Sequence, residues 1–280
     1  MKKGGCDLHT HSVFSDGTFT PKELIEEAER RGLSAIALTD HNTMSGMTEF
    51  LEAAEGSSVE AVTGVELSTD YGDKELHIVG LFIKKEDFDK VEELVKELDK
   101  RKMESNVILA ENLRKGGYDI SLEEMLKKAL NGYINRAHFA MELVKKGYVK
   151  TREEAFATLL SKDGGYYEEP KKLPVYETIA FLKKLGAVAI LAHPFLSLTE
   201  GELRAFLPKA KEVGLDGMET VYSTYDDGTT LLAKRIAREF GLKESGGSDF
   251  HGGNKPDISM GIGRGNLFVP DYFVEELRKN

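Results

Sequence analysis

The segment Asp7-Leu8-His9-Thr10-His11 is the part of this chain from which its fold and chemistry can be read. In an extended strand, side chains two positions apart point to the same face, so His9 and His11 can both reach one ion from the strand end. Imidazole is a common ligand of zinc, manganese and iron. Taken alone, a His-x-His pair is equally compatible with two solvated histidines, so its meaning depends on the rest of the chain.

Further segments of the same kind follow along the chain, and each contains a histidine or a carboxylate at its end. The additional candidate ligands are Asp16, His41, Glu66, His77, His193, Asp249 and His251. His138 is the one histidine of the seven outside this set. A structural zinc site would normally recruit cysteine thiolates, and the chain has one cysteine. The ligand set therefore favours a catalytic metal centre.

Short segments rich in β-branched residues alternate with longer amphipathic ones, which predicts βα units around a parallel sheet. Every candidate ligand lies at or just after the end of a predicted strand, and in a parallel barrel these ends converge on one face. Nine ligands suit two or three ions, with Glu66 as the natural bridge. The predicted strands span about residues 5–9, 35–39, 61–66, 76–82, 188–192, 217–221 and 243–246.

Helix starts are well marked by capping boxes at Thr20-Pro21-Lys22-Glu23, Ser121-Leu122-Glu123-Glu124 and Thr151-Arg152-Glu153-Glu154, and Gly32 should end the first helix. Between about residues 86 and 161 the strand pattern disappears, which predicts a helical insertion. We therefore expect residues 1–100 to form the first part of a barrel, 101–168 a helical cap that binds substrate, and 169–280 the second part.

The formal net charge of −10 and the pI near 5.4 argue against broad electrostatic attraction to nucleic acid. An anionic substrate would have to be captured locally. The opening residues lack an apolar stretch of signal-peptide length, and no segment approaches about 20 apolar residues. We expect a cytoplasmic protein without a membrane span or an evident obligate protein partner, and a buried Cys6 thiol.

Asn135-Arg136-Ala137-His138 should begin a helix in the insertion, where free N–H groups and a guanidinium could hold a phosphate. Capping alone is the alternative interpretation. Lys172 in the return segment and Arg101 on the long helix are further candidates for phosphate contacts, although such charges are often merely solvated.

The motifs around His9, Asp16, His41, Glu66, His193 and Asp249, taken in order, resemble the polymerase and histidinol phosphatase (PHP) family over nearly the whole chain. The resemblance implies a distorted seven-stranded (β/α)7 TIM-like barrel that holds two or three divalent ions, often manganese, iron or zinc. It implies one ion on His9, His11, Glu66 and Asp249, a second on Glu66, His77 and His193, and a third on Asp16, His41 and His251.

The insertion resembles the subgroup that removes the 3′-phosphate from nucleoside 3′,5′-bisphosphates or degrades short RNA from its 5′ end, with Arg136 and His138 on the substrate phosphate. The expected activity is hydrolysis of a phosphate monoester of a small nucleotide-like substrate by a metal-bridging hydroxide. Asp16 and His193 would support that hydroxide as ligands of the ions. Asp40 would support it by orienting one of the ligands, and a helix cap is the alternative role for Asp40. A 5′→3′ exoribonuclease, a metal-dependent amidohydrolase and a non-catalytic metal- or nucleic-acid-binding module remain alternatives.

Overall fold

The computed structural model describes residues 4–128 and 134–279. The chain divides into two compact units, a barrel unit of Met1–Glu93 with Leu173–Asn280 and a helical unit of Leu94–Lys172. The insertion expected at 101–168 falls inside the helical unit. Within the described residues no helix combines the length and the apolar character that a membrane span requires.

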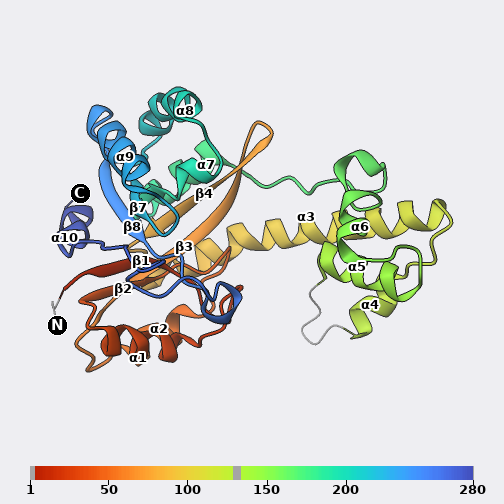
Figure 1. Cartoon of the computed structure of the whole chain (residues 1–280), viewed down its shortest axis with the longest axis horizontal. Helices are drawn as coiled ribbons and strands as arrows, with labels where there is room; N and C mark the ends of the chain where they lie inside the picture. The colour runs from red at the N-terminus through yellow and green to blue at the C-terminus, as the bar shows by residue number, and fades with distance from the viewer. Residues whose placement is uncertain (1–3, 129–133, 280) are drawn as a thin grey trace. The chain divides into compact units, whose positions relative to one another are not determined.

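The barrel unit is built on a nearly closed sheet of seven strands, as the sequence predicts (Figure 1). A further two-residue strand, β5 (Leu173–Pro174), pairs with β3 outside the main order. The sheet order is β1 (Cys6–Thr10), β2 (Ala35–Leu38), β3 (Glu60–Tyr71), β4 (Lys74–Leu81), β6 (Val188–Leu191), β7 (Gly217–Tyr222) and β8 (Lys243–Gly247).

The prediction of a wholly parallel sheet is wrong at β4, which runs antiparallel to both β3 and β6. A parallel connection needs a crossover of a dozen or more residues, whereas only Gly72 and Asp73 separate β3 from β4. Gly72 has φ +64°, the left-handed backbone that tight hairpin turns require. β3 therefore continues past its predicted end at Glu66 and returns as a long hairpin.

The barrel closes between β1 and the segment that follows β8. The Asp249 N–H donates to the His9 carbonyl and the His11 N–H donates to the Phe250 carbonyl, both at 2.9 Å. A Cβ at Gly247 would overlap the backbone nitrogen of His9, so the close approach of these segments requires glycine there. Strands distant in sequence thus become neighbours at the predicted ligand segments.

Among the described residues, the α-helices that lie wholly in the barrel unit are α1 (Pro21–Arg31), α2 (Met47–Ala53), α7 (Val175–Lys184), α8 (Glu200–Glu212), α9 (Asp227–Glu239) and α10 (Tyr272–Arg278). The capping box at Thr20 and the left-handed Gly32 that ends α1 are both confirmed. The barrel core contains strand residues such as Leu8 and Ile190, packed with Phe273 of α10. Cys6 is buried in this core, as expected, and burial raises the pKa of its thiol.

The helical unit contains most of α3 (Phe88–Lys115), with α4 (Leu122–Lys128), α5 (Arg136–Lys145) and α6 (Arg152–Ala157). At Thr151 only half of the predicted capping box is present: the Thr151 side chain accepts the Glu154 N–H, whereas the Glu154 side chain accepts the Lys150 N–H instead of that of Thr151. The unit has its own apolar core, in which Leu109 and Leu113 of α3 pack with Phe139 and Leu143 of α5. It can therefore be described as a separately packed body.

Candidate metal centre

All nine candidate ligands gather at one rim of the barrel, although not all of them sit at the ends of strands. Glu66 lies within β3 and His77 within β4, which corrects the expectation that every ligand ends a strand. Thr63 of β3 pairs with Leu38, the last residue of β2, so Glu66 lies level with the rim. Because β4 is antiparallel, its early residues, including His77, return to the same level.

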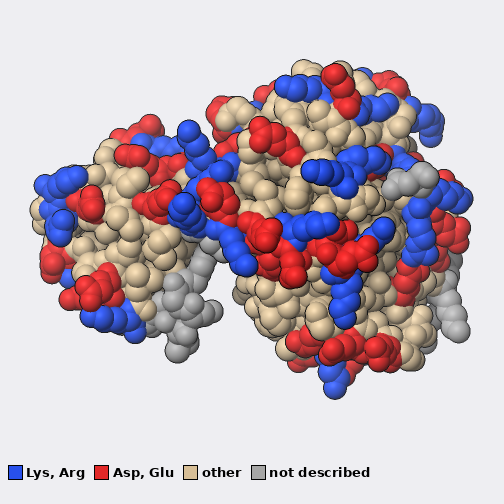
Figure 2. Space-filling model, turned by 180° about the vertical axis from the view of Figure 1, so that it is seen from behind, with Lys and Arg blue, Asp and Glu red and all other residues tan. Residues whose placement is uncertain are grey.

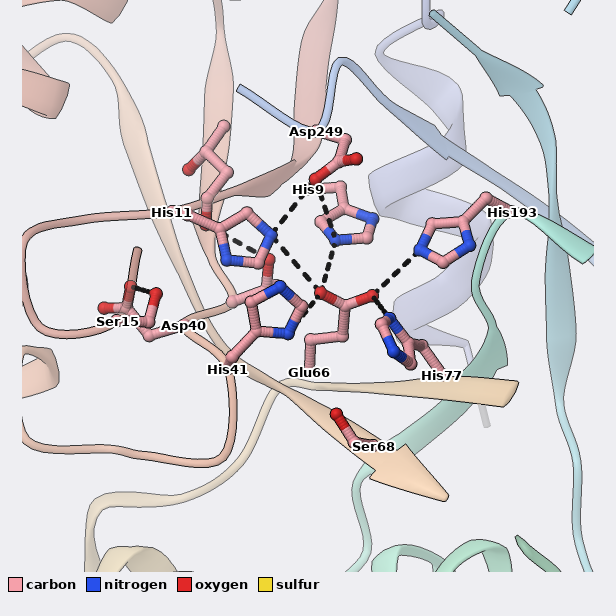
Figure 3. Close-up of polar contacts among 12 residues, drawn as sticks. His9, His11, Ser15, Asp40, His41, Glu66, Ser68, His77, His193 and Asp249 are labelled. Carbon is pink, nitrogen blue, oxygen red and sulfur yellow. Dashed lines mark hydrogen bonds and ion pairs between the residues drawn. The ribbon is translucent and has the colours of Figure 1, made fainter. Parts of the chain in front are cut away.

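Glu66 is the centre of the cluster and is fully buried. Its Oε2 lies 3.1 Å from His9 Nε2, 3.3 Å from His11 Nε2 and 3.0 Å from His41 Nδ1. Its Oε1 lies 2.8 Å from His77 Nδ1 and 3.0 Å from His193 Nε2. The imidazole rings point toward this carboxylate from several strands and loops (Figure 3).

Two further groups adjoin Glu66. Asp249 Oδ1 lies 3.3 Å from His11 Nε2 and 3.8 Å from His9 Nε2. Asp16 Oδ1 lies 3.1 Å from His251 Nε2 and 3.8 Å from His41 Nε2. The structure thus brings together His9, His11 and Asp249; His9, Glu66 and His193; His41, Glu66 and His77; and His11, Asp16, His41 and His251.

The donor atoms fit divalent ions. In the part of the chain that the structure describes, the buried side-chain polar atoms without a hydrogen-bond partner are His9 Nε2, His11 Nδ1, His11 Nε2, His41 Nδ1, Glu66 Oε2 and His251 Nε2. Buried polar atoms are rarely left without partners, because each costs about 1–3 kcal/mol. Two ligands that share one ion at about 2.1 Å lie about 3.0–3.4 Å apart, as many of these atoms do. Ions between them would supply the missing partners.

Electrostatics couples the cluster tightly. Burial would raise the pKa of Glu66, yet the surrounding histidines, His9 and His77 foremost, hold it well below the usual range. Burial opposes a charge on His77, but the Glu66 carboxylate raises its pKa to about 10. Burial lowers the pKa of His41 to about 3. Glu66 is therefore an anion that attracts cations, whether protons on histidine or metal ions.

Glu219 on β7 is a supporting residue that sequence reasoning missed. Its Oε1 lies 2.8 Å from His9 Nδ1, and its Oε2 accepts the His193 N–H at 2.6 Å. A carboxylate that receives the Nδ1–H of His9 leaves Nε2 free to bind an ion. The sequence signal that could have identified Glu219 is a glutamate that follows a glycine and an apolar residue at the start of β7, Gly217-Met218-Glu219. The structure shows that it is buried.

Asp40 acts on a loop rather than on a histidine. Its carboxylate accepts hydrogen bonds from the Ser12 N–H at 2.7 Å and from the Ser12 and Ser15 hydroxyls at 2.6 Å. The helix-cap alternative is wrong, because α2 begins after Gly46 without a side-chain cap. Asp40 therefore fixes the loop that carries Asp16.

Two candidate ligands have unusual backbone conformations. His193 has φ +29° and Asp249 has φ +57°, in the range that favours glycine. Such conformations cost about 1–3 kcal/mol and cluster at functional sites, where the surroundings hold them. Here the His193 N–H bonds to Glu219 and the Asp249 N–H bonds to His9.

The residues predicted to bind substrate phosphate all lie in the helical unit and make contacts there. The Arg136 guanidinium lies 4.2 Å from the centre of the Tyr167 ring. Lys172 Nζ lies 3.6 Å from a Glu169 oxygen, and Arg101 donates to the Lys172 carbonyl at 3.4 Å.

The expectation of free N–H groups at the start of α5 is wrong. The Asn135 side chain accepts from the Ala137 and His138 N–H groups, and the Asn135 N–H donates to His138 Nδ1 at 3.2 Å. An asparagine cap satisfies these donors within the chain. A phosphate at this site would have to rely on the Arg136 and His138 side chains.

A barrel with histidines and carboxylates crowded at one rim is the architecture of metal-dependent hydrolases. The chain matches the PHP domain over residues 7–168. It is 32% identical to a 5′-3′ exoribonuclease of Haemophilus influenzae over 88% of this chain and 89% of the relative. It is 28% identical to a 3′,5′-nucleoside bisphosphate phosphatase of Chromobacterium violaceum over 88% of this chain and 86% of the relative.

A solved structure of a protein from Bifidobacterium adolescentis, assigned as a metal-dependent phosphoesterase, superposes with a TM-score of 0.74. The two are 28% identical, and the match covers 99% of this chain and 96% of the other. This chain belongs to the PHP family of metal-dependent phosphoesterases and is a phosphoric ester hydrolase.

Proposed function

We propose that this enzyme hydrolyses a phosphate monoester of a small nucleotide, favouring the 3′-phosphate of nucleoside 3′,5′-bisphosphates. The observation that carries the proposal is the convergence of histidines on Glu66 (Figure 3), where several buried ligand atoms have no hydrogen-bond partner. The phosphatase relative from Chromobacterium violaceum, matched over most of both chains, supports this substrate class.

The nine rim residues are proposed to hold two or three divalent ions of manganese, iron or zinc. When bound, such ions supply a hydroxide near neutral pH and offset the charge of the phosphate. Glu66 is proposed as the bridge, because its two oxygens face different histidines. Asp16 and His193 hold the outer edges of the cluster, and Asp40 keeps the loop of Asp16 in place.

The local charge explains how an acidic protein can bind an anion. Three divalent ions would outweigh the carboxylates of Asp16, Glu66 and Asp249, so the site becomes positive despite the net charge of −10. On the face shown in Figure 2, acidic and basic side chains of the barrel unit are interspersed. We therefore assign the binding of the anionic substrate to the metal ions and to a few basic side chains rather than to a broad basic surface.

Arg136 and His138 are proposed to hold the second phosphate of the substrate. The Tyr167 ring beneath Arg136 and the Leu160 carbonyl restrain the guanidinium, and the Asn135 cap holds the His138 ring through its Nδ1. A fixed guanidinium binds phosphate with little further loss of side-chain entropy.

The test is phosphate release from adenosine 3′,5′-bisphosphate and from adenosine 5′-monophosphate, after metal depletion and reloading with one metal at a time. We expect release to require metal and to favour the bisphosphate, with adenosine 5′-monophosphate as the product. Glu66→Gln should lower kcat by more than a hundredfold, whereas Glu29→Gln on α1, paired with Ser57, should not change it. Equal rates for Glu66→Gln and the parent enzyme would refute the proposed centre.

A 5′-3′ exoribonuclease is the second candidate, because the Haemophilus influenzae relative carries that name. An exonuclease should release mononucleotides stepwise from the 5′ end of a short RNA. The same metal-loaded protein should therefore be given oligomers of two to five nucleotides beside the bisphosphate. A higher kcat/KM on the oligomers would favour the exonuclease.

A further inference from the structure

Lys255 is a charged side chain at the metal centre to which the sequence motifs give no role. It follows His251 by one short turn, η4 (Gly252–Asn254). Its Nζ lies 2.6 Å from Asp249 Oδ2, and its side chain is 37% exposed. The other carboxylate oxygen of Asp249, Oδ1, faces His9 and His11. Lys255 therefore contacts a proposed ligand through the oxygen that is not directed at these histidines.

The backbone around Lys255 is fixed to the loop that carries Asp16. The Asn254 side chain donates to the Asp16 carbonyl at 2.8 Å, and the Gly253 N–H donates to the Thr18 hydroxyl at 2.8 Å. The Lys255 N–H closes the turn on the Gly252 carbonyl. Because hydrogen bonds hold the backbone at several points, the Lys255 side chain is directed toward Asp249 rather than extending freely into solvent.

The two oxygens of Asp249 have different surroundings. Oδ2 accepts from Lys255 and from the Tyr222 hydroxyl, each at 2.6 Å. Oδ1 faces His11 Nε2 at 3.3 Å and His9 Nε2 at 3.8 Å. Two short hydrogen bonds, one of them charge-assisted, occupy Oδ2. Only Oδ1 remains directed at the proposed ion.

We propose that Lys255 is a positioning residue which, together with Tyr222, confines Asp249 to binding its ion through a single oxygen. This inference rests on the proposed metal centre and adds a determinant of metal preference. A carboxylate that binds through both oxygens raises the coordination number, which suits larger ions with flexible geometry better than zinc. Removal of the Oδ2 partners should therefore move the site toward higher coordination.

The test uses Co²⁺ as a coloured probe, together with Zn²⁺ and Mn²⁺ binding to the metal-depleted full chain. Lys255→Met, Tyr222→Phe and the double variant should weaken the visible Co²⁺ absorption, which falls as coordination number rises. They should also shift the ratio of Mn²⁺ to Zn²⁺ affinity about tenfold toward Mn²⁺. Lys255→Arg keeps a donor and should stay near the parent protein.

Lys22→Met on α1 is the matched control, because Lys22 is exposed and its partner Glu26 lies 3.8 Å away. If Lys255→Met fails to fold, Tyr222→Phe removes one hydroxyl and carries the same expectation. A parent protein that binds no Co²⁺ would refute the metal centre itself. A parent that binds Co²⁺ with a spectrum and metal ratio unchanged in every variant would overturn the role of Lys255 alone.

Discussion

Glu219→Gln should weaken metal binding strongly, although it replaces one carboxylate oxygen with an NH₂ group and Glu219 is not one of the predicted ligands. Both oxygens of Glu219 accept hydrogen bonds, one near His9 Nδ1 at 2.8 Å and one from the His193 N–H at 2.6 Å. A glutamine can accept at one position only and must place its NH₂ group at the other. The two donors around it therefore cannot both be satisfied.

Each orientation of the glutamine harms one proposed ligand. With its NH₂ toward His9, the ring must accept at Nδ1, so the proton moves to Nε2, the atom that should bind the ion. With its NH₂ toward His193, two N–H groups face each other and the strained residue shifts. Loss of such a support typically costs 10–100-fold in metal affinity, about 1.4–2.7 kcal/mol.

The assay is calorimetric titration of Mn²⁺ into the metal-depleted parent and variant, with thermal unfolding of both measured in parallel. Glu244→Gln on the neighbouring β8 is the control, because its carboxylate accepts the Thr220 hydroxyl at 2.8 Å and contacts no proposed ligand in the described structure. Identical Mn²⁺ affinity and stoichiometry in parent and Glu219→Gln would show that Glu219 does not orient the ligands.

Asp40→Ala removes the acceptor of three hydrogen bonds and should lower the free energy of unfolding by about 2–4 kcal/mol in urea titrations; a loss below 0.5 kcal/mol would contradict its role. Arg136→Ala should lower kcat/KM for a bisphosphate at least tenfold more than for a monophosphate, and equal losses would exclude a phosphate contact. Hydrogen bonds from Thr199 and Lys74 lower the pKa of Glu202 from 4.5 to about 2, so its contribution to stability is present above pH 4.5 and is lost as the pH falls through about 2. Glu202→Gln should therefore destabilise the protein at pH 7 and progressively less as the pH falls from 4.5 toward 2, and a difference that does not shrink over that range would refute this.

Features that depend on short-range chemistry could be predicted from the sequence. The Thr20 capping box, the Pro21 start and the Gly32 end of α1 need only a few adjacent residues, and the structure has all three. The ligand segments could be grouped because the carboxyl ends of parallel barrel strands lie at one rim. His77 lies at the same rim for a different reason, because β4 is antiparallel and its early residues return to that level.

Features that depend on long-range partners could not be predicted. The direction of β4 is the exception, because the local Gly72-Asp73 turn indicates an antiparallel return, although the βα alternation of the rest of the chain favours a parallel strand. Glu219 and Lys255 are recognised only because β7 and the loop after β8 come next to His9 and Asp249 in space. The Asn135 cap competes with the predicted phosphate site for the same donors, and sequence alone cannot decide that competition.

The metal centre also explains why so polar a cluster can occupy the rim of an apolar barrel. Without ions, the neighbours of Glu66 are in opposite protonation states, since the Glu66 carboxylate raises the pKa of His77 to about 10 while burial lowers that of His41 to about 3. Protons cannot charge all the imidazole rings, because a charged ring repels the next one. Several buried ring nitrogens therefore remain without a hydrogen-bond partner. Divalent ions remove this conflict, because every imidazole can then stay neutral and use its lone pair. The arrangement that is unfavourable for the empty protein would thus become the source of affinity in the proposed metal centre, and the binding energy would offset the strain at His193 and Asp249.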